Sequence, residues 1–344
     1  MVTSTPGGDQ GLRSPLESVP LRRPGVVRRT MHIDVEPPTS FGSSLELVGG
    51  ARDLLTTSGR GGRTVSVVLA TAEVRATFDR QRRLATLVTK PSAKWTESLV
   101  GVRAGGGYRS ALAESVPTGE EASLLRQVLD DLPAGALISG YAWMRLARRA
   151  GEHPGRLMPE GALDRMTDLC SGWRKGGVAV QSVAAGGGVP VQDCPPATDL
   201  GIEDADAWHE IEQLAPDWMR RRRLLDVELD ARLEPGGFRI WSMFRDTVGE
   251  PDGSEVVLHE YAVRARGSGS ILTQLEAEPR VLPFPECPGA APAVDRLSGL
   301  DVATLDESVP RIITGVASCT HLNDLLRSLA GTGTLLGVAR SHVA

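Results

Sequence analysis

The same series of short sequence motifs occurs twice along this chain in the same order. This repeat constrains the fold more than any other feature. Arg28-Arg29 precede Asp34-Val35 near the start, and Arg221-Arg222-Arg223 precede Asp226-Val227 near the middle. Later signals repeat with an offset between 188 residues (Pro91 to Pro279) and 198 residues (Leu99 to Leu297). Because a repeated order of elements is typical of a repeated structural unit, we predict two copies of one lobe.

The two copies differ in their reactive side chains. The second copy contains Cys319, His321 and Asp324, where residues 122–127 of the first copy have alanine, leucine and glutamine. The segment of the first copy that corresponds to His259 also contains no histidine. We therefore predict that any chemistry lies in the second copy.

Composition restricts the class of protein. The chain has 344 residues, which suggests about two domains, and 41% of them are hydrophobic. Its net charge of −5 does not provide the basic surface of a nucleic-acid partner. Without a long apolar run or a signal-peptide core, we expect a cytoplasmic protein with no membrane partner. We expect its four cysteines to be free thiols, and a homodimer is compatible with the sequence.

We divide the chain into four segments. Residues 1–26 are rich in Gly, Pro, Ser and Thr, a composition typical of a disordered leader. Residues 27–139 form the degenerate N-terminal lobe, and residues 220–337 form the C-terminal lobe with the predicted site. Between them, residues 140–219 form a mainly helical insertion. Each lobe is predicted to be a small antiparallel sheet followed by helices, an α+β plan.

Hydrophobic periodicity predicts the individual elements. Alternating and β-branched segments indicate strands from residue 45, over 63–76, 83–89, 222–232, 238–246, 255–266 and 270–278, the last with a helix as the alternative. Leucines at helical spacing predict a helix over residues 120–132 that Pro133 ends, and another over 320–330 with Gly331 as its C-cap. Within the insertion we expect helices at 141–150, at 164–172 and from residue 204, and a strand at 178–183.

Cys319, His321 and Asp324 form the first candidate site. Cys319 lies at the start of the predicted last helix, where free N–H groups and the helix dipole would stabilise a thiolate. His321 is expected to be neutral there, fit for a general base or a metal ligand. Asp324 is three residues further on the same helical face, so it can orient His321. The structural alternative is that Asp324 caps or solvates the helix and His321 is a satisfied polar group.

His259 and Tyr261 form the second candidate pair. On a strand they share one face, and Glu260 points to the other. Either the His259–Tyr261 face or Glu260 therefore faces a cleft, and the alternative is an ordinary cross-strand pair at the surface.

Arginines and a further cysteine complete the candidate residues. Residues 220–223 are four consecutive arginines, and alternate members share one face of the strand. Arg221 and Arg223, together with Arg245, are therefore candidates to bind a carboxylate or phosphate. The alternative is that these arginines form salt bridges to residues 203–212. Cys287, Cys319 and His321 would make a soft-metal site for zinc or iron. The chain has no CxxC and no HxxxH spacing, and so the cofactor is left open as none or one metal ion.

Two further motifs contain polar side chains beside tryptophan. Trp208-His209-Glu210 is predicted on a helix of the insertion, and residues 168–173 at a helix end. Packing is the simpler explanation for both.

Several segments together resemble a bacterial family known only as a domain of unknown function. These segments are RRTMHIDV, GYAWMR, DLCSGW, AWHE, MFRD, LHEY, RVLPFPECP and CTHLNDLLRSLA, and they cover about residues 27–336. The resemblance implies a shared fold and brings no activity with it.

The last lobe is also similar, more weakly, to the plan of the NifU-type iron–sulfur scaffold. A short sheet, the proline-flanked Cys287, a helix, and Cys319 at the start of a final helix carry that similarity. The family uses three cysteines and an aspartate. Only Cys287 and Cys319 correspond here, so His259 or His321 would have to substitute for a missing ligand.

These observations lead to three functional hypotheses. The first is an enzyme of lyase, isomerase, hydratase or acyl-transfer type that acts on an organic acid or acyl thioester in a cleft between the lobes. Cys319 would be its nucleophile or acid, His321 its base and Asp324 the orienting group, with His259 and Tyr261 polarising the substrate. The second is a metal or iron–sulfur scaffold or maturation protein, and the third is a non-catalytic accessory protein.

Overall fold

The computed structural model describes residues 14–37, 39–40, 42–119, 123–151, 161–191, 193–230 and 236–343. Residues 1–13 of the predicted leader, 120–122 of a predicted helix and 231–232 of a predicted strand lie outside these ranges.

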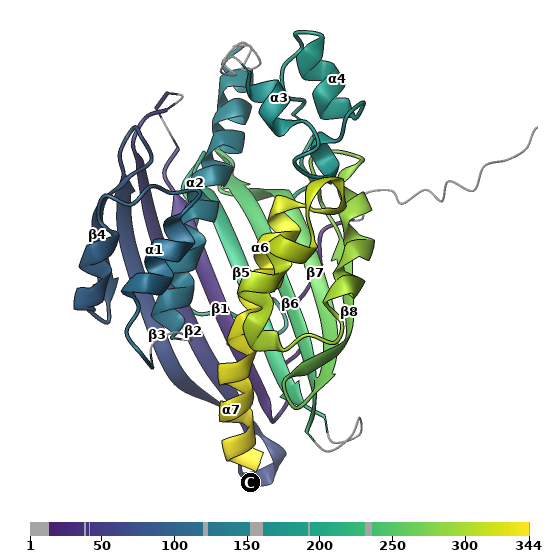
Figure 1. Cartoon of the computed structure of the whole chain (residues 1–344). Helices are drawn as coiled ribbons and strands as arrows, with labels where there is room; N and C mark the ends of the chain where they lie inside the picture. Colours follow the sequence, from purple (N-terminus) through teal and green to yellow (C-terminus); the bar gives the residue numbers. More distant parts are fainter. Residues whose placement is uncertain are drawn as a thin grey trace, which may run out of the picture.

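A single antiparallel sheet of eight strands forms the centre of the molecule, in the order β4-β3-β2-β1-β5-β6-β7-β8 (Figure 1). Each strand pairs antiparallel with its neighbours, and β1 joins the two halves by pairing with β5. The strands are β1 (Val26–Val35), β2 (Leu45–Ser58), β3 (Thr64–Phe78), β4 (Leu84–Lys90), β5 (Met219–Leu229), β6 (Gly237–Gly249), β7 (Glu255–Ser268) and β8 (Ile271–Pro279).

The larger helices cover one face of this sheet (Figure 1). Helix α2 packs against β1, β2 and β3, α6 lies against β6, and α7 lies against β5 and β1. The short helices α3 and α4 lie beyond the sheet, beside the end of α2 (Figure 1). The elements are α1 (Tyr108–Ser115), α2 (Leu124–Arg149), α3 (Ala162–Met166), α4 (Val178–Ala184), the 3-10 segment η5 (Cys287–Leu297), α5 (Leu305–Ile312), α6 (Thr320–Ser328) and α7 (Thr332–Val343).

The α+β class is confirmed, but the sheets of the two halves are not separate. Arg28 on β1 donates to both carboxylate oxygens of Asp226 on β5, at 2.7 Å each, and Arg220 binds Asp34 in the same way. In each pair the two residues lie directly opposite one another in the β1–β5 register. The two arginines and the two aspartates are separated by the same number of residues, since 220 − 28 and 226 − 34 both equal 192. They tie the two halves into one sheet, and the repeat itself stays a prediction.

Helix α2 corrects two sequence predictions. It runs without a break from Leu124 to Arg149 through Pro133, so the proline does not end it and residue 140 is no domain boundary. Its buried side chains pack with the first four strands in one apolar core, and Gly135 lies so close to Ile33 that a Cβ there would be 3.1 Å from its methyl group. Burial on this scale outweighs the cost of one proline inside a helix.

The first described residues correct the predicted leader. Residues 14–25, here called the strap, cross the sheet face opposite the helices, where Leu16 and Val19 are buried. The Leu16 N–H donates to Glu260 at 2.6 Å, and its carbonyl accepts from Arg245 at 2.7 Å. The sequence prediction of disorder is therefore wrong for the strap, because backbone hydrogen bonds to buried charges hold it.

Three smaller predictions are also wrong. Residues 178–183 form helix α4 rather than a strand, and residues 204–218 are turns and loop that lead into β5. Gly331 does not cap α6, because the chain continues through a short 3-10 turn into α7. A Cβ on Gly331 would be 1.9 Å from the Gln127 amide nitrogen, so this glycine permits close packing of α2 against the end of α6.

Among the described helices, none combines the length and apolarity needed to cross a bilayer.

Candidate functional site

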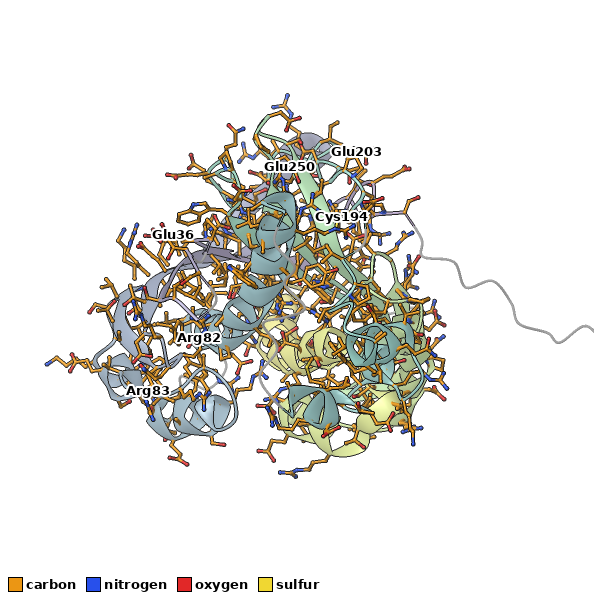
Figure 2. All side chains as sticks on the ribbon, turned by 90° about the horizontal axis from the view of Figure 1, so that it is seen from above. Glu36, Arg82, Arg83, Cys194, Glu203 and Glu250 are labelled. Carbon is orange, nitrogen blue, oxygen red and sulfur yellow. The ribbon has the colours of Figure 1, made fainter. Side chains whose placement is uncertain are left out.

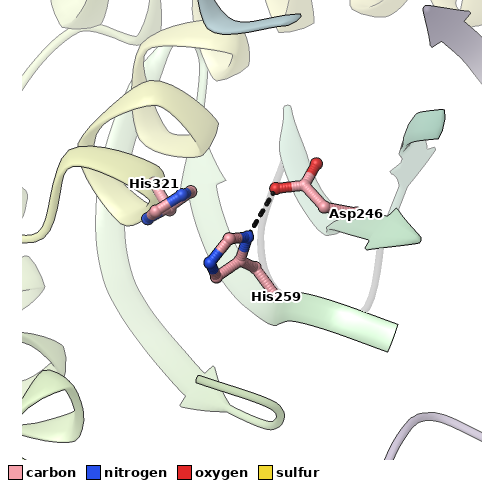
Figure 3. A group of neighbouring side chains, drawn as sticks. All are labelled: Asp246, His259 and His321. Atoms are coloured by element: carbon pink, nitrogen blue, oxygen red, sulfur yellow. Dashed lines mark hydrogen bonds and ion pairs between the residues drawn. The ribbon is translucent and has the colours of Figure 1, made fainter. Parts of the chain in front are cut away.

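Three side chains from separate elements meet between the sheet and α6. Asp246 comes from β6, His259 from β7 and His321 from the first turn of α6, and one ligand-type atom of each lies within 4.8 Å of the others (Figure 3). His259 Nδ1 is 3.1 Å from Asp246 Oδ2. The rings of His259 and His321 are stacked, with centroids 4.1 Å apart and planes 28° apart. Strand alternation places Asp246 and His259 on the helix-covered face, directly opposite one another in the β6–β7 register.

Asp246 is held as a carboxylate. Its two oxygens accept from Arg221 Nε at 2.7 Å and Nη2 at 2.9 Å. Burial alone would raise the pKa of Asp246, but the Arg221 guanidinium and His259 outweigh burial and lower that pKa below its usual range. The carboxylate therefore fixes the orientation of His259 and leaves its Nε2 unused by Asp246.

His321 is neutral at neutral pH. Burial is the main cause of a pKa well below that of free histidine, and His259 and Arg221 lower it further. Asp246 and Asp324 act in the opposite direction, so they would stabilise the imidazolium once a proton arrives. His321 can therefore accept a proton, and its surroundings then stabilise the imidazolium that forms.

Asp324 is the centre of an arginine cluster. One oxygen accepts from Arg109, and the other accepts from Arg223 and, at 2.9 Å, from Arg221. Arg223 also binds both oxygens of the buried Asp131. Burial would raise the pKa of Asp324, but Arg223, Arg109 and Arg221 outweigh it and lower the pKa. This network links α1, α2, β5 and α6.

A cavity of about 610 Å³ opens beside this cluster. One wall, on the side of the first four strands, is lined by Arg82, Arg109 and residues 133, 134 and 136–140 of α2; Arg82 is labelled in Figure 2. Arg221 and one face of α6 line the other wall, which includes His321. The volume of this cavity is in the range of small-molecule binding sites.

The cysteines are free thiols, as predicted, but the predicted thiolate role of Cys319 and the predicted cysteine metal site are contradicted. Cys319 lies in the apolar core with Cys287, and the cavity lining includes neither. Burial raises the pKa of the Cys319 thiol; the backbone N–H groups of Leu322 and His321 oppose this, as expected at a helix N-terminus, but are outweighed. Burial also raises the pKa of Cys287. In the described part of the chain, the group suited to a metal is Asp246, His259 and His321 rather than the predicted Cys287, Cys319 and His321.

Other predicted roles change as well. Asp324 binds arginines and makes no hydrogen bond to His321 within the described chain, so it is not the orienting group; Asp246 orients His259 instead. Tyr261 shares the face of His259 as predicted, but it is buried and donates to the Cys287 carbonyl at 3.2 Å.

Of the predicted substrate arginines, Arg221 alone lines the cavity. Arg223 is buried between Asp131 and Asp324. Arg245 points to the opposite face, where it binds Glu260, because it precedes the inward Asp246 on a strand. The predicted alternation that sends Glu260 away from His259 is thereby confirmed.

Sequence reasoning missed several residues at this site: Asp246, Arg109, Arg327, Asn323 and Arg82. Asp246 had a signal, since the pair Arg245-Asp246 recurs in both copies and only one member of such a pair can face the helices. The others come from segments far apart in the chain, and no local pattern marks them.

A second pair of stacked histidines lies on the strap face of the sheet. His32 on β1 and His209 have ring centroids 4.9 Å apart, with His32 Nδ1 and His209 Nε2 at 2.7 Å. His209 Nδ1 also contacts the Thr30 hydroxyl at 2.8 Å. Burial, followed by nearby charges that include Arg220 and Arg222, lowers the pKa of each histidine to about 3. Trp208-His209-Glu210 lies in a loop and not on the predicted helix.

This pair predicts a loss of stability on mild acidification. Below pH 6.5 the unfolded chain takes up protons that the folded His32 and His209 do not, so the free energy of unfolding falls as pH falls. Between pH 7 and pH 5 we expect a loss of about 1–2 kcal/mol per histidine, measured by urea denaturation. The double variant His32→Gln/His209→Gln should reduce this slope to the part that His321 contributes, and the exposed His342→Gln should leave the slope unchanged. An unchanged slope in the double variant would contradict the assignment.

Comparisons with known proteins find a family that part of the chain is similar to. Residues 219–334 match the model of a family described as a protein of unknown function (DUF2889), which confirms the predicted resemblance to an uncharacterised family. No curated protein matches the sequence. One solved structure, titled "Lipid-protein interactions in lipovitellin", is 7% identical with a TM-score of 0.15. The alignment covers 93% of this chain and 34% of that one, and a similarity this low supports no argument.

Proposed function

We propose that this protein is a small-molecule enzyme that transfers a proton to or from an organic acid or acyl thioester in the cavity between α2 and α6. The observation that carries the proposal is His321, a neutral imidazole on the cavity wall with two carboxylates nearby. Proton transfer at the carbon next to a carbonyl is common to lyases, isomerases and hydratases. The burial of Cys319 in the apolar core removes support from thiolate chemistry, so acyl transfer through that cysteine is not part of the proposal.

Asp246 and His259 support His321 in this scheme. His259 stacks on His321 from behind, and Asp246 fixes His259. Arg221 connects the two halves of the site, since it binds both Asp246 and Asp324 and lines the cavity. A proton gained by His321 would be stabilised by these two carboxylates without any movement of the chain.

A metal-assisted enzyme or metal-binding protein is the second candidate, because two histidines and one aspartate are the ligand set of several zinc and iron centres. The resting geometry is less suited to it. Ring nitrogen lone pairs lie in the ring plane, and with planes only 28° apart the two imidazoles do not converge on one ion. Both oxygens of Asp246 are also bound by Arg221. A metal would require one ring to turn and Arg221 to release the carboxylate.

An exchange screen tests the proposal. The protein is incubated in D₂O with a panel of small organic acids and acyl-coenzyme A thioesters, and loss of the α-proton signal is followed by NMR. We expect exchange of C–H for C–D in at least one compound at a rate well above that of the panel without protein. No exchange in any compound, together with stoichiometric zinc or iron by elemental analysis that is lost in His259→Ala, would favour the metal-binding alternative.

A further inference from the structure

Arg327 differs from most other arginines around the cavity in its lack of a carboxylate partner. Arg109 binds Asp130 and Asp324, and Arg221 binds Asp246 and Asp324. For Arg327, on the same face of α6 as Asn323, the described residues provide no carboxylate oxygen within 4.0 Å. Its positive charge at the cavity wall is therefore left for a ligand.

Two buried polar atoms in this part of the wall also have no partner in the described chain. They are Nε of Arg327 and Oδ1 of Asn323, which lie one helical turn apart. Asn323 is held in place because its Nδ2 donates to the Ile313 carbonyl at 2.9 Å. An unmade hydrogen bond at a buried atom costs about 1–3 kcal/mol, so an unpaired donor and an unpaired acceptor one helical turn apart on the cavity wall indicate a ligand with complementary groups.

Apart from the charged and polar residues around His321 and Asp324, most of the exposed surface of the cavity lining is apolar. Leu137 on α2 and Leu169 are 62% and 57% exposed, unusual for leucine, and both line the cavity. Pro133, Ile138 and Pro310 lie along the same lining. Because a large exposed apolar surface beside polar groups is typical of a binding groove, this wall suits a hydrocarbon chain.

We propose that the cavity binds an amphipathic carboxylic acid, with its carboxylate on Arg327 and its chain along Leu137 and Leu169. Asn323 Oδ1 accepts a hydrogen bond from a hydroxyl group or bound water at the same end. This inference rests on the proposed function and narrows its ligand from an organic acid or acyl thioester to an acid with a free carboxylate. Arg82, the other cavity arginine without a carboxylate partner among the described residues, would add to the local positive potential.

Titration calorimetry with octanoate and octanamide tests this site, because the two probes share a chain and differ in charge. We expect wild-type protein to bind octanoate at least 10-fold more tightly than octanamide. Arg327→Gln should weaken octanoate about 10-fold or more and remove the preference, whereas Leu137→Asn should weaken both probes alike. The matched control is Arg311→Gln, on the exposed surface of α5, which should change neither affinity.

Equal affinities of the wild type for the two probes, binding of neither, or an unchanged octanoate affinity in a folded Arg327→Gln would overturn the proposal. Binding of free coenzyme A in preference to octanoate would also overturn it. Circular dichroism confirms that each variant is folded. His321→Gln separates this inference from the proposed function: it should reduce the rate of proton exchange by about 10²–10⁴-fold and leave octanoate affinity within about 2-fold, since His321 does not hold the carboxylate.

Discussion

Replacing Asp324 with asparagine is expected to lower the free energy of unfolding by about 3–5 kcal/mol. Asp324 is the shared acceptor of Arg109, Arg221 and Arg223, and the last two of these are buried. The substitution preserves shape and removes one negative charge from a largely buried site. Loss of a partner from a buried ion pair leaves the remaining charge uncompensated, and here three guanidinium groups share that loss.

Urea denaturation of wild type and Asp324→Asn at pH 7 measures the effect. The matched control is Asp306→Asn, because Asp306 pairs with one arginine, Arg126, at 3.4 Å near the surface. We expect the control to cost no more than about 1 kcal/mol. A loss of the same small size in both variants would show that water compensates the cluster and that Asp324 is not its centre.

Acidification is also expected to lower the free energy of unfolding through the carboxylates of this cluster. The pKa of Asp324 and that of Asp246 are lower in the folded protein than in the unfolded chain. Their contribution to stability is therefore complete above the unfolded value of about 4 and is lost as pH falls through the folded values. Above about pH 5 these two carboxylates contribute a constant amount, so the effect of His32 and His209 can be measured there by itself.

The strands were the most predictable part of the fold. Residues 238–246 and 255–266 alternate apolar and polar side chains or contain β-branched ones. They form β6 and β7, and only the ends of these strands differ from the prediction. Local pattern is sufficient there because each strand has to bury one face. Pro133 shows the limit: its local effect on a helix is real, but the tertiary packing of α2 outweighs it.

The site was predictable only in part. His259 and His321 were identified from their absence in the first copy, and the structure brings them into contact. Their environment was not predictable, because Asp324 meets Arg109 across 215 residues and Arg221 across 103. Cys319 illustrates the same difficulty, since its position at a helix start is as expected and the apolar core around it decides its protonation.

The largest effect on activity is expected from His321→Gln, which should reduce the rate of proton exchange by about 10²–10⁴-fold. Glutamine keeps a polar side chain at the cavity wall but cannot accept the proton. The unfolding temperature should change little, because no buried ion pair involves this histidine in the described chain. Exchange followed by NMR at saturating substrate isolates the rate from any change in binding.

The pH profile distinguishes a catalytic His321 from a structural one. Because its pKa lies well below 6.5, wild-type exchange should remain constant from pH 8 to below pH 6.5 and fall only at lower pH. His259 lowers the pKa of His321, so His259→Asn should move the inflection to higher pH. A structural role for His321 would leave the inflection unmoved in His259→Asn. If the folded His321→Gln variant kept the wild-type exchange rate, another group would have to accept the proton. That result would refute the proposed mechanism.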